Sequence, residues 1–240
     1  RPGLHRRSMM LSPPKAGTTR VSALIMPLIV FLTLILASAA LTIYGEMTGP
    51  ARRPVVYVFK PLTTFLIIVL AASLPAEPAS RYRLAITLGL VLSLAGDVFL
   101  MLPGDRFVAG LAAFTLTHLA YLAAFTIEAP FAAVPAAFVL FAIAEAPILF
   151  VTWPRLQRRL RLPVLVYAAV LGAMAAQALT QALLNPILPA IAAAVGAALF
   201  VVSDSTLVYN RFVRPFRLSP LLVLSTYYAA QILIALSVLP

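Results

Sequence analysis

The sequence is poor in charge, and above all in acidic residues. Only 10% of its 240 residues are charged, with seven Asp and Glu against 18 Lys and Arg, whereas 62% are hydrophobic. A soluble domain has about 25% charged residues and could not cover its surface with so few. The composition therefore excludes a soluble enzyme, a nucleic-acid-binding protein and a disordered chain, and favours a polytopic membrane protein. The net charge of +11 then indicates basic loops that contact lipid head groups.

The chain also has no cysteine and only two histidines, His5 and His118. The absence of cysteine excludes disulfides, thiolate catalysis and cysteine-ligated metals. Two histidines are too few for a histidine-rich metal site. We therefore expect neither a metal nor any other cofactor.

Long apolar runs fill most of the chain and predict an all-α bundle of about eight transmembrane helices. A spanning helix needs about 20 apolar residues, and the candidate segments are approximately 23–44, 55–73, 84–102, 106–126, 131–152, 163–183, 186–208 and 219–239. The sixth and seventh are divided at Asn185-Pro186, because together they are too long for one span. The first run ends in small residues like a signal peptide, but its length favours a retained helix. We expect one domain over residues 23–240 after a basic tail over residues 1–22.

The distribution of basic residues predicts the orientation in the membrane. The loops after the first, third, fifth and seventh segments, here called the odd-numbered loops, contain Arg52, Arg53, Arg106, Arg155, Arg158, Arg159, Arg161, Arg211, Arg214 and Arg217. The other loops contain only Arg81 and Arg83, so we expect the odd-numbered loops in the cytosol and both termini outside. The basic tail opposes this bias unless translation starts at Met9 or Met10. Richness in Ala, Pro and Arg suggests a bacterial protein, and hence the cytoplasmic (inner) membrane.

Five ionisable side chains fall inside the predicted spans, where each is expensive unless it has a partner or a function. They are Lys60, Asp97, His118, Glu145 and Asp204. The two aspartates lie about five residues before the ends of the third and seventh segments. We therefore expect them at one depth, about 8 Å inside the cytosolic face. Because short Asp side chains cannot extend to the interface, these two are the catalytic candidates.

Other polar residues of the same half of the membrane are candidates for substrate binding or support. Lys60, Glu145, Tyr227 and Gln231 lie towards the level of the aspartates, and His118 lies deeper. Three of them also have simpler explanations. Lys60 can extend to the interface, Glu145 can pair with a loop arginine, and His118 can be an interior hydrogen bonder.

A short internal similarity relates the surroundings of the two aspartates. Residues 96–100 (GDVFL) resemble residues 203–207 (SDSTL), and an Arg-Phe pair follows each. This similarity predicts a 4+4 internal repeat that would bring both carboxyl groups to a shared cavity. Small residues at Gly89 and Ser93 also predict close helix packing that turns Asp97 towards the bundle interior.

Several motifs in combination resemble the YhhN family over residues 55–240. They are Lys60-Pro61-Leu62-Thr63-Thr64, Ser93 to Leu102, Phe114 to Tyr121 with His118, Ser203-Asp204-Ser205 with Asn210-Arg211-Phe212, and Tyr227 to Gln231. The resemblance implies an eight-helix integral membrane hydrolase, a lysoplasmalogenase. Such enzymes cleave the vinyl ether bond of lysoplasmalogens and release a fatty aldehyde and glycerophospho-ethanolamine or -choline. The resemblance also implies that Asp97 and Asp204 carry the chemistry, and that Lys60, His118 and Tyr227 belong to the site.

This chemistry suits a pair of carboxyl groups. Protonation of the vinyl carbon gives an oxocarbenium ion that water attacks, so the reaction needs one acid and one nearby carboxylate, as glycoside hydrolysis does. Two carboxyl groups in low-dielectric surroundings repel each other when both are charged, so one of them can keep its proton. The residues leave open which aspartate is the acid. The expected partners are a lysophospholipid substrate and membrane lipids, without nucleic acid.

Two other functions fit the same residues. A proton-coupled transporter of a small or lipidic substrate could use paired aspartates, although the nearly uncharged opposite half favours a one-sided site. A metal-dependent hydrolase could use Asp97, His118 and Asp204, although His118 is expected about two turns deeper than the aspartates. The physiological substrate could also be another lysolipid, because many bacteria make no plasmalogens.

Overall fold

The computed structural model describes residues 16–75 and 80–240, which form eight α-helices and two short 3-10 helices, without a strand. The elements are α1 (Ala16–Thr48), η1 (Pro50–Arg52), α2 (Arg53–Ser73), α3 (Arg81–Met101), α4 (Phe107–Glu128), α5 (Pro135–Thr152), η2 (Trp153–Arg155), α6 (Arg158–Leu184), α7 (Leu188–Phe212) and α8 (Ser219–Leu236). Each of the eight α-helices provides a segment long and apolar enough to cross a membrane. The predicted all-α bundle is therefore confirmed, and the chain is an integral membrane protein.

Several helices extend beyond the predicted spans. α6 begins at Arg158 rather than at residue 163, because arginine is a good helix former and its long side chain keeps the charge in the interface. α7 continues to Phe212, so Asp204 lies eight residues, or about 12 Å, from its end. Of the predicted tail, residues 1–15 lie outside the described residues and residues 16–22 belong to α1. The 4+4 repeat stays a prediction.

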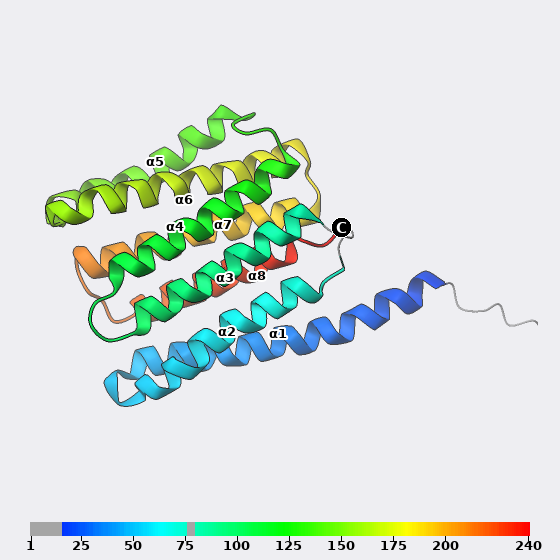
Figure 1. Ribbon diagram of the computed structural model, residues 1–240, viewed down its shortest axis with the longest axis horizontal. Coiled ribbons are helices and arrows are strands. Elements are labelled where there is room, and N and C mark those ends of the chain that lie inside the picture. The colour runs from blue at the N-terminus through cyan, green and yellow to red at the C-terminus, as the bar shows by residue number, and fades with distance from the viewer. Residues whose placement is uncertain (1–15, 76–79) are drawn as a thin grey trace, which may run out of the picture.

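The helices run roughly parallel to one another (Figure 1). α3, α4, α7 and α8 form the middle of the bundle, with α1 and α2 on one side and α5 and α6 on the other. The most extensive contacts join α3 to α4, α7 to α8 and α4 to α6. All odd-numbered loops lie at one end of the bundle (Figure 1). The arginines of these loops are thus gathered at that end.

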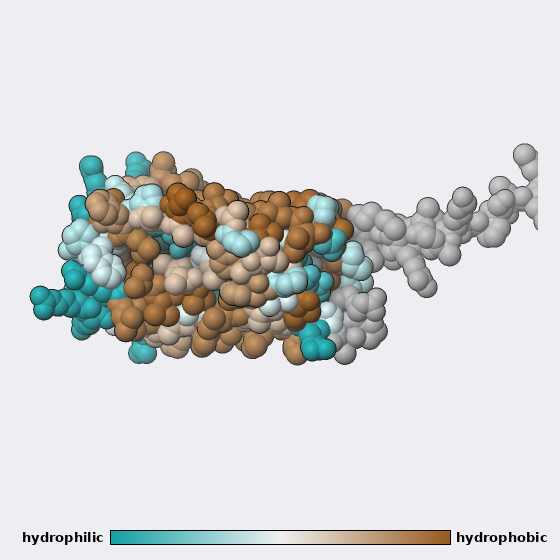
Figure 2. All heavy atoms as spheres, turned by 90° about the horizontal axis from the view of Figure 1, so that it is seen from above, coloured by the Kyte–Doolittle hydropathy of each residue, from teal (hydrophilic) through white to brown (hydrophobic). Residues whose placement is uncertain are grey.

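The outer surface has the distribution of polarity that a bilayer requires. Large apolar side chains point outwards from the middle of the helices, for example Val91, Leu116 and Ile143, with 47%, 51% and 65% of their surfaces exposed. Figure 2 shows one face of this surface, with a broad apolar region in the middle and hydrophilic residues at the ends. Lipid chains can cover such a surface without a hydrophobic penalty.

Small residues allow the central helices to approach closely, as predicted for α3. A Cβ atom at Gly96 would lie 2.7 Å from the Phe114 ring of α4, and one at Gly196 would lie 2.9 Å from the Ala230 carbonyl oxygen of α8. Each glycine therefore provides the space that its neighbouring helix occupies. Asp97, next to Gly96, faces the interior and is 2% exposed.

Candidate active site

The two aspartates line the same cavity, although 107 positions separate them in the sequence. The cavity has a volume of about 70 Å³ and lies between α2, α3, α4, α6, α7 and α8. Lys60, Tyr167 and Tyr227 also line it, together with apolar side chains. The expected shared cavity is therefore present. Its volume would hold about two water molecules or the reacting atoms of a larger substrate.

Asp97 of α3 is surrounded by hydrogen-bond donors. Its Oδ2 atom accepts hydrogen bonds from the Thr64 hydroxyl at 2.6 Å and from the Tyr227 hydroxyl at 2.7 Å. Its Oδ1 atom lies 3.7 Å from the Lys60 ammonium nitrogen. The Lys60 side chain is therefore directed into the bundle, and the alternative that it extends to the interface is wrong.

A chain of buried hydrogen bonds continues away from Asp97. The Tyr121 hydroxyl donates to the Gln231 amide oxygen at 2.6 Å, and the Gln231 amide nitrogen donates to the Ser93 hydroxyl at 2.5 Å. Ser93 is 2.7 Å from the Tyr227 hydroxyl, which itself donates to Asp97. Because the Tyr227 hydroxyl proton is donated to Asp97, Ser93 accepts from Gln231 and donates to Tyr227. Each donor thus points towards the Asp97 carboxylate, and such a chain stabilises a negative charge at its end.

Asp204 of α7 has a different environment. Its Oδ2 atom accepts a hydrogen bond from the Tyr167 hydroxyl of α6. The Nε2 atom of His118 lies 3.0 Å from the same hydroxyl and 3.7 Å from Asp204 Oδ2. No lysine or arginine of the described residues forms an ion pair with Asp204. This carboxyl group therefore has fewer charged and donating neighbours than Asp97.

His118 of α4 is fully buried, and the Phe200 ring packs on it with centroids 4.7 Å apart. The prediction that it lies about two turns deeper than the aspartates was wrong for Asp204, because α7 extends further than predicted and carries Asp204 to the depth of His118. Within residues 16–75 and 80–240, no three His, Cys, Asp or Glu side chains form a group that could hold a metal ion. The histidine therefore belongs to the surroundings of Asp204, as an interior hydrogen bonder.

Glu145 of α5 lies outside the shared cavity, behind Asp204. It is 6% exposed, and its Oε1 atom has no hydrogen-bond partner among the described residues. A second cavity of about 30 Å³ is lined by Glu145, Tyr167 and Asp204. A pair with a loop arginine, the alternative considered above, is not among the ion pairs of the described chain. A Cβ atom at Gly172 would lie 3.1 Å from the carboxylate, so this glycine makes room for it.

The sequence pattern missed two polar contacts of the site, Thr64 and Tyr167. Thr64 is part of the motif that follows Lys60, but threonine is common in membrane helices because its hydroxyl can bond to its own helix. Tyr167 lies in the predicted sixth span, where a buried hydroxyl needs a partner. That requirement was the available signal, but it does not identify the partner.

The chain resembles known membrane proteins along most of its length. Residues 55–238 match the YhhN family. The human protein named lysoplasmalogenase TMEM86B is 36% identical over 163 residues, 68% of this chain and 67% of its own length. A lysoplasmalogenase of Mycobacterium bovis is 34% identical over 79% of this chain and 72% of its own length. The membrane protein YhhN of Escherichia coli is 30% identical over 83% of this chain and 94% of its own length. No solved structure matches the chain.

Proposed function

The chain belongs to the YhhN family, and on this basis we propose that it is a membrane lysoplasmalogenase. It would hydrolyse the vinyl ether bond of lysoplasmalogens to a fatty aldehyde and glycerophospho-ethanolamine or -choline. Relatives named lysoplasmalogenase in human and Mycobacterium bovis support this activity. The observation that carries the proposal is the single cavity that two carboxyl groups share inside an apolar helix bundle.

The unequal surroundings of the two aspartates support different roles. Asp97 has an ammonium group and two hydroxyl donors around it, which favour the carboxylate. Asp204 has one hydroxyl donor and forms no ion pair with a lysine or arginine of the described residues. We therefore assign the acid to Asp204 and the base to Asp97.

The reaction then needs only these two groups and one water molecule. Asp204 gives its proton to the vinyl carbon remote from the ether oxygen, and the electron pair of the double bond forms the new C–H bond. The Asp97 carboxylate stabilises the resulting oxocarbenium ion and takes a proton from water as the water oxygen attacks. In the collapse of the hemiacetal, Asp97 protonates the departing glycerol oxygen and Asp204 takes the hydroxyl proton. Both aspartates thereby return to their initial states.

The remaining candidates have supporting roles in this proposal. Lys60 and Tyr227 hold the Asp97 carboxylate, and Gln231 acts on Tyr227 through Ser93. Tyr167 and His118 orient the Asp204 carboxyl group. Glu145 lines the second cavity with Asp204 and is a supporting residue there. The alkenyl chain lies between the helices and in lipid, because the cavity is far smaller than pockets that enclose a ligand of this size.

We also propose that the chain resides in the inner membrane of a bacterium with its odd-numbered loops in the cytosol. The end that carries these loops has ten arginines, whereas the other loops contain Arg81 and Arg83. The positive-inside bias supports the cytosolic assignment of the arginine-rich end. The site then opens towards the cytosolic leaflet.

The decisive experiment is an aldehyde assay with purified protein and a synthetic 1-alkenyl lysophosphoethanolamine. We expect release of fatty aldehyde, and none from the saturated 1-alkyl analogue. Asp97→Asn and Asp204→Asn should each lower kcat by about 10²- to 10⁴-fold, the contribution of a general acid or base. Chelators should leave the activity unchanged.

Failure to release aldehyde, beside an active lysoplasmalogenase as positive control, would contradict the proposal. Uptake of the intact lipid into proteoliposomes without aldehyde would favour a transporter instead. Full activity of either Asn variant in a folded protein would remove that aspartate from the mechanism.

A further inference from the structure

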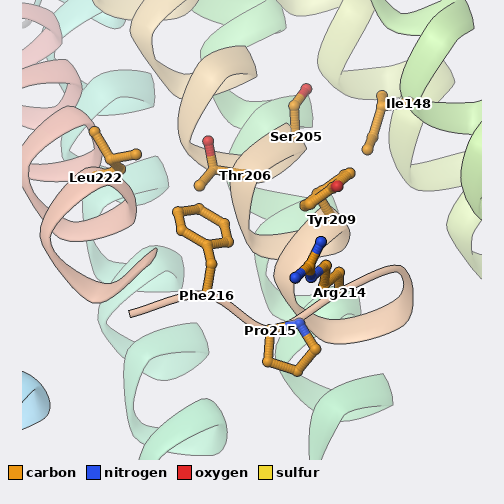
Figure 3. A pocket seen from close by; sticks show the side chains of 8 residues that line it. All are labelled: Ile148, Ser205, Thr206, Tyr209, Arg214, Pro215, Phe216 and Leu222. Atoms are coloured by element: carbon orange, nitrogen blue, oxygen red, sulfur yellow. The ribbon is translucent and has the colours of Figure 1, made fainter. Parts of the chain in front are cut away.

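A groove of about 750 Å³ lies on the surface beside the carboxylate cavity, between α5, α7 and the start of α8. Figure 3 shows Leu222 and Ile148 on opposite sides of this groove, with Ser205 and Thr206 of α7 between them. Arg214 lies in the loop that closes the lower end in this view (Figure 3). The groove therefore combines apolar sides, hydroxyl groups and a cation, near the end of the bundle that carries the odd-numbered loops.

No Asp or Glu of the described part of the chain forms an ion pair with Arg214. Within residues 16–75 and 80–240, no Asp or Glu lines the groove either. Arg211 is different, because it pairs with Asp105 at 2.6 Å and stacks on Phe107 at 4.3 Å. The guanidinium of Arg214 is thus available for an anion. Arginine suits a phosphate group, whose oxygens it can contact in a bidentate manner.

Local contacts hold the loop of the groove in place. The Asn210 side-chain oxygen accepts a hydrogen bond from the Phe216 backbone nitrogen at 3.0 Å. The Arg214 backbone nitrogen donates to the Tyr209 carbonyl oxygen at 3.1 Å. The rings of Tyr209 and Phe216 pack with centroids 6.3 Å apart. Two aromatic rings near the cation suit the other half of a zwitterionic head group, since a ring face attracts ammonium and choline.

The groove adjoins the proposed catalytic residues through shared walls. Ser205 and Ile148 line both the groove and the 30 Å³ cavity, and Asp204 lines both that cavity and the 70 Å³ cavity. Asp204 and Tyr209 are five residues apart on α7, or about 8 Å along the helix. In a lysoplasmalogen, a glycerol and a phosphoester lie between the vinyl ether and the head group. One molecule can therefore extend from Asp204 to the groove.

Lys60, the other cation near the cavity, is less suited to this task. It is 8% exposed, and its charge is already opposed by Asp97 at 3.7 Å. We therefore propose that the groove is the head-group site of the substrate lysophospholipid, with its phosphate on Arg214 and its ammonium or choline against Tyr209 and Phe216. This inference rests on the proposed function, because it adds a specificity site to the same reaction.

The test compares two substrates that differ only in the phosphate-bearing head group. Aldehyde release is measured in an uncharged detergent from 1-alkenyl lysophosphoethanolamine and from 1-alkenyl glycerol. We expect Arg214→Gln to raise KM at least about tenfold for the first substrate, the value of a charged hydrogen bond, and to leave the second unchanged. Arg214→Lys should give a KM for the first substrate between those of the native protein and Arg214→Gln. Arg217→Gln removes the same charge from an exposed arginine of the same loop outside the groove and should have no effect.

A second measurement separates this inference from the proposed function. The saturated 1-alkyl lysophosphoethanolamine has no vinyl ether, so its equilibrium binding does not depend on turnover. We expect Arg214→Gln to raise the Kd for this saturated lipid at least about tenfold. If the native protein releases no aldehyde but shows this loss, the proposed function fails and the head-group site stands. If the native protein is active but the Kd is unchanged, or Arg217→Gln weakens binding equally, the head-group site is wrong.

Discussion

At the residue scale, two adjacent tyrosines of α8 differ in what their hydroxyl groups contact. Tyr227 donates to the Asp97 carboxylate at 2.7 Å, whereas the Tyr228 hydroxyl has no hydrogen-bond partner among the described residues. Both side chains are less than 5% exposed. Tyr227→Phe should lower kcat about 10- to 100-fold, because a hydrogen bond to a charged group contributes about 1.5–3 kcal/mol.

The matched control is Tyr228→Phe, which removes a buried hydroxyl without a partner. This variant should keep full activity, and its Tm in detergent should be equal to or higher than that of the native protein. Equal losses of kcat in the two variants would mean that the Asp97 contact has no special role.

Lys60 and Asp97 form a buried pair, and the free energy of unfolding should reveal their dependence on each other. Lys60→Met leaves the Asp97 carboxylate without its cation, which should cost about 3–5 kcal/mol of stability. The double variant Lys60→Met/Asp97→Asn removes both charges and should recover most of that stability without recovering activity. Unfolding in detergent, followed by circular dichroism, measures both. A double variant no more stable than Lys60→Met would show that the pair does not account for the loss.

The carboxyl groups inside the spans could be predicted as site residues from the sequence, whereas the hydroxyl groups that contact them could not. Asp97 and Asp204 were identified because a carboxyl group inside a span needs an explanation. Thr64 and Tyr167 were missed because their hydroxyl groups are tolerated in membrane helices. Only the packing of α2 and α6 beside the aspartates brings these hydroxyls to the carboxylates.

At the scale of elements, the contact between α3 and α4 depends on the absence of a side chain at Gly96. Gly96→Ala would put a methyl group 2.7 Å from the Phe114 ring, and overpacking of this kind costs about 1–3 kcal/mol. We expect a lower Tm for Gly96→Ala and partial recovery in Gly96→Ala/Phe114→Leu, since the smaller side chain vacates that space. If the second substitution lowered the Tm further, the clash would not be the cause. Stability is the readout, because Phe114 also lines the cavity.

The number of helices could be predicted from apolar length, but not where each helix ends or which neighbour it contacts. Hydropathy falls at the first arginine, whereas α6 includes Arg158, Arg159 and Arg161 in its first turn or two. The same limit placed Asp204 too near the end of α7 and too far from His118. Lipid-facing and buried positions are both apolar, so the pattern along a membrane helix contains little information about its partners.

At the scale of the whole molecule, the charges divide into two groups with different tasks. Most arginines lie at the end of the bundle that carries the odd-numbered loops, while Lys60, Asp97 and Asp204 lie inside the bundle. In the proposed function, the arginine-rich end orients the protein and the interior groups supply the chemistry. Because the proposed head-group groove opens near the same end, orientation decides which leaflet supplies the substrate.

The absence of cysteine makes this orientation directly testable. Gln157 lies in the loop between α5 and α6, Asn185 lies between α6 and α7, and both side chains are exposed at opposite ends of the bundle. Gln157→Cys and Asn185→Cys would each introduce the only thiol of this sequence. In intact bacterial spheroplasts, a membrane-impermeant maleimide should label Asn185→Cys and leave Gln157→Cys unlabelled until the membrane is opened. The cysteine-free parent chain is the control for labelling of other proteins. The reverse pattern would place the arginine-rich end outside the cell, against the positive-inside bias, and the substrate would then enter from the outer leaflet.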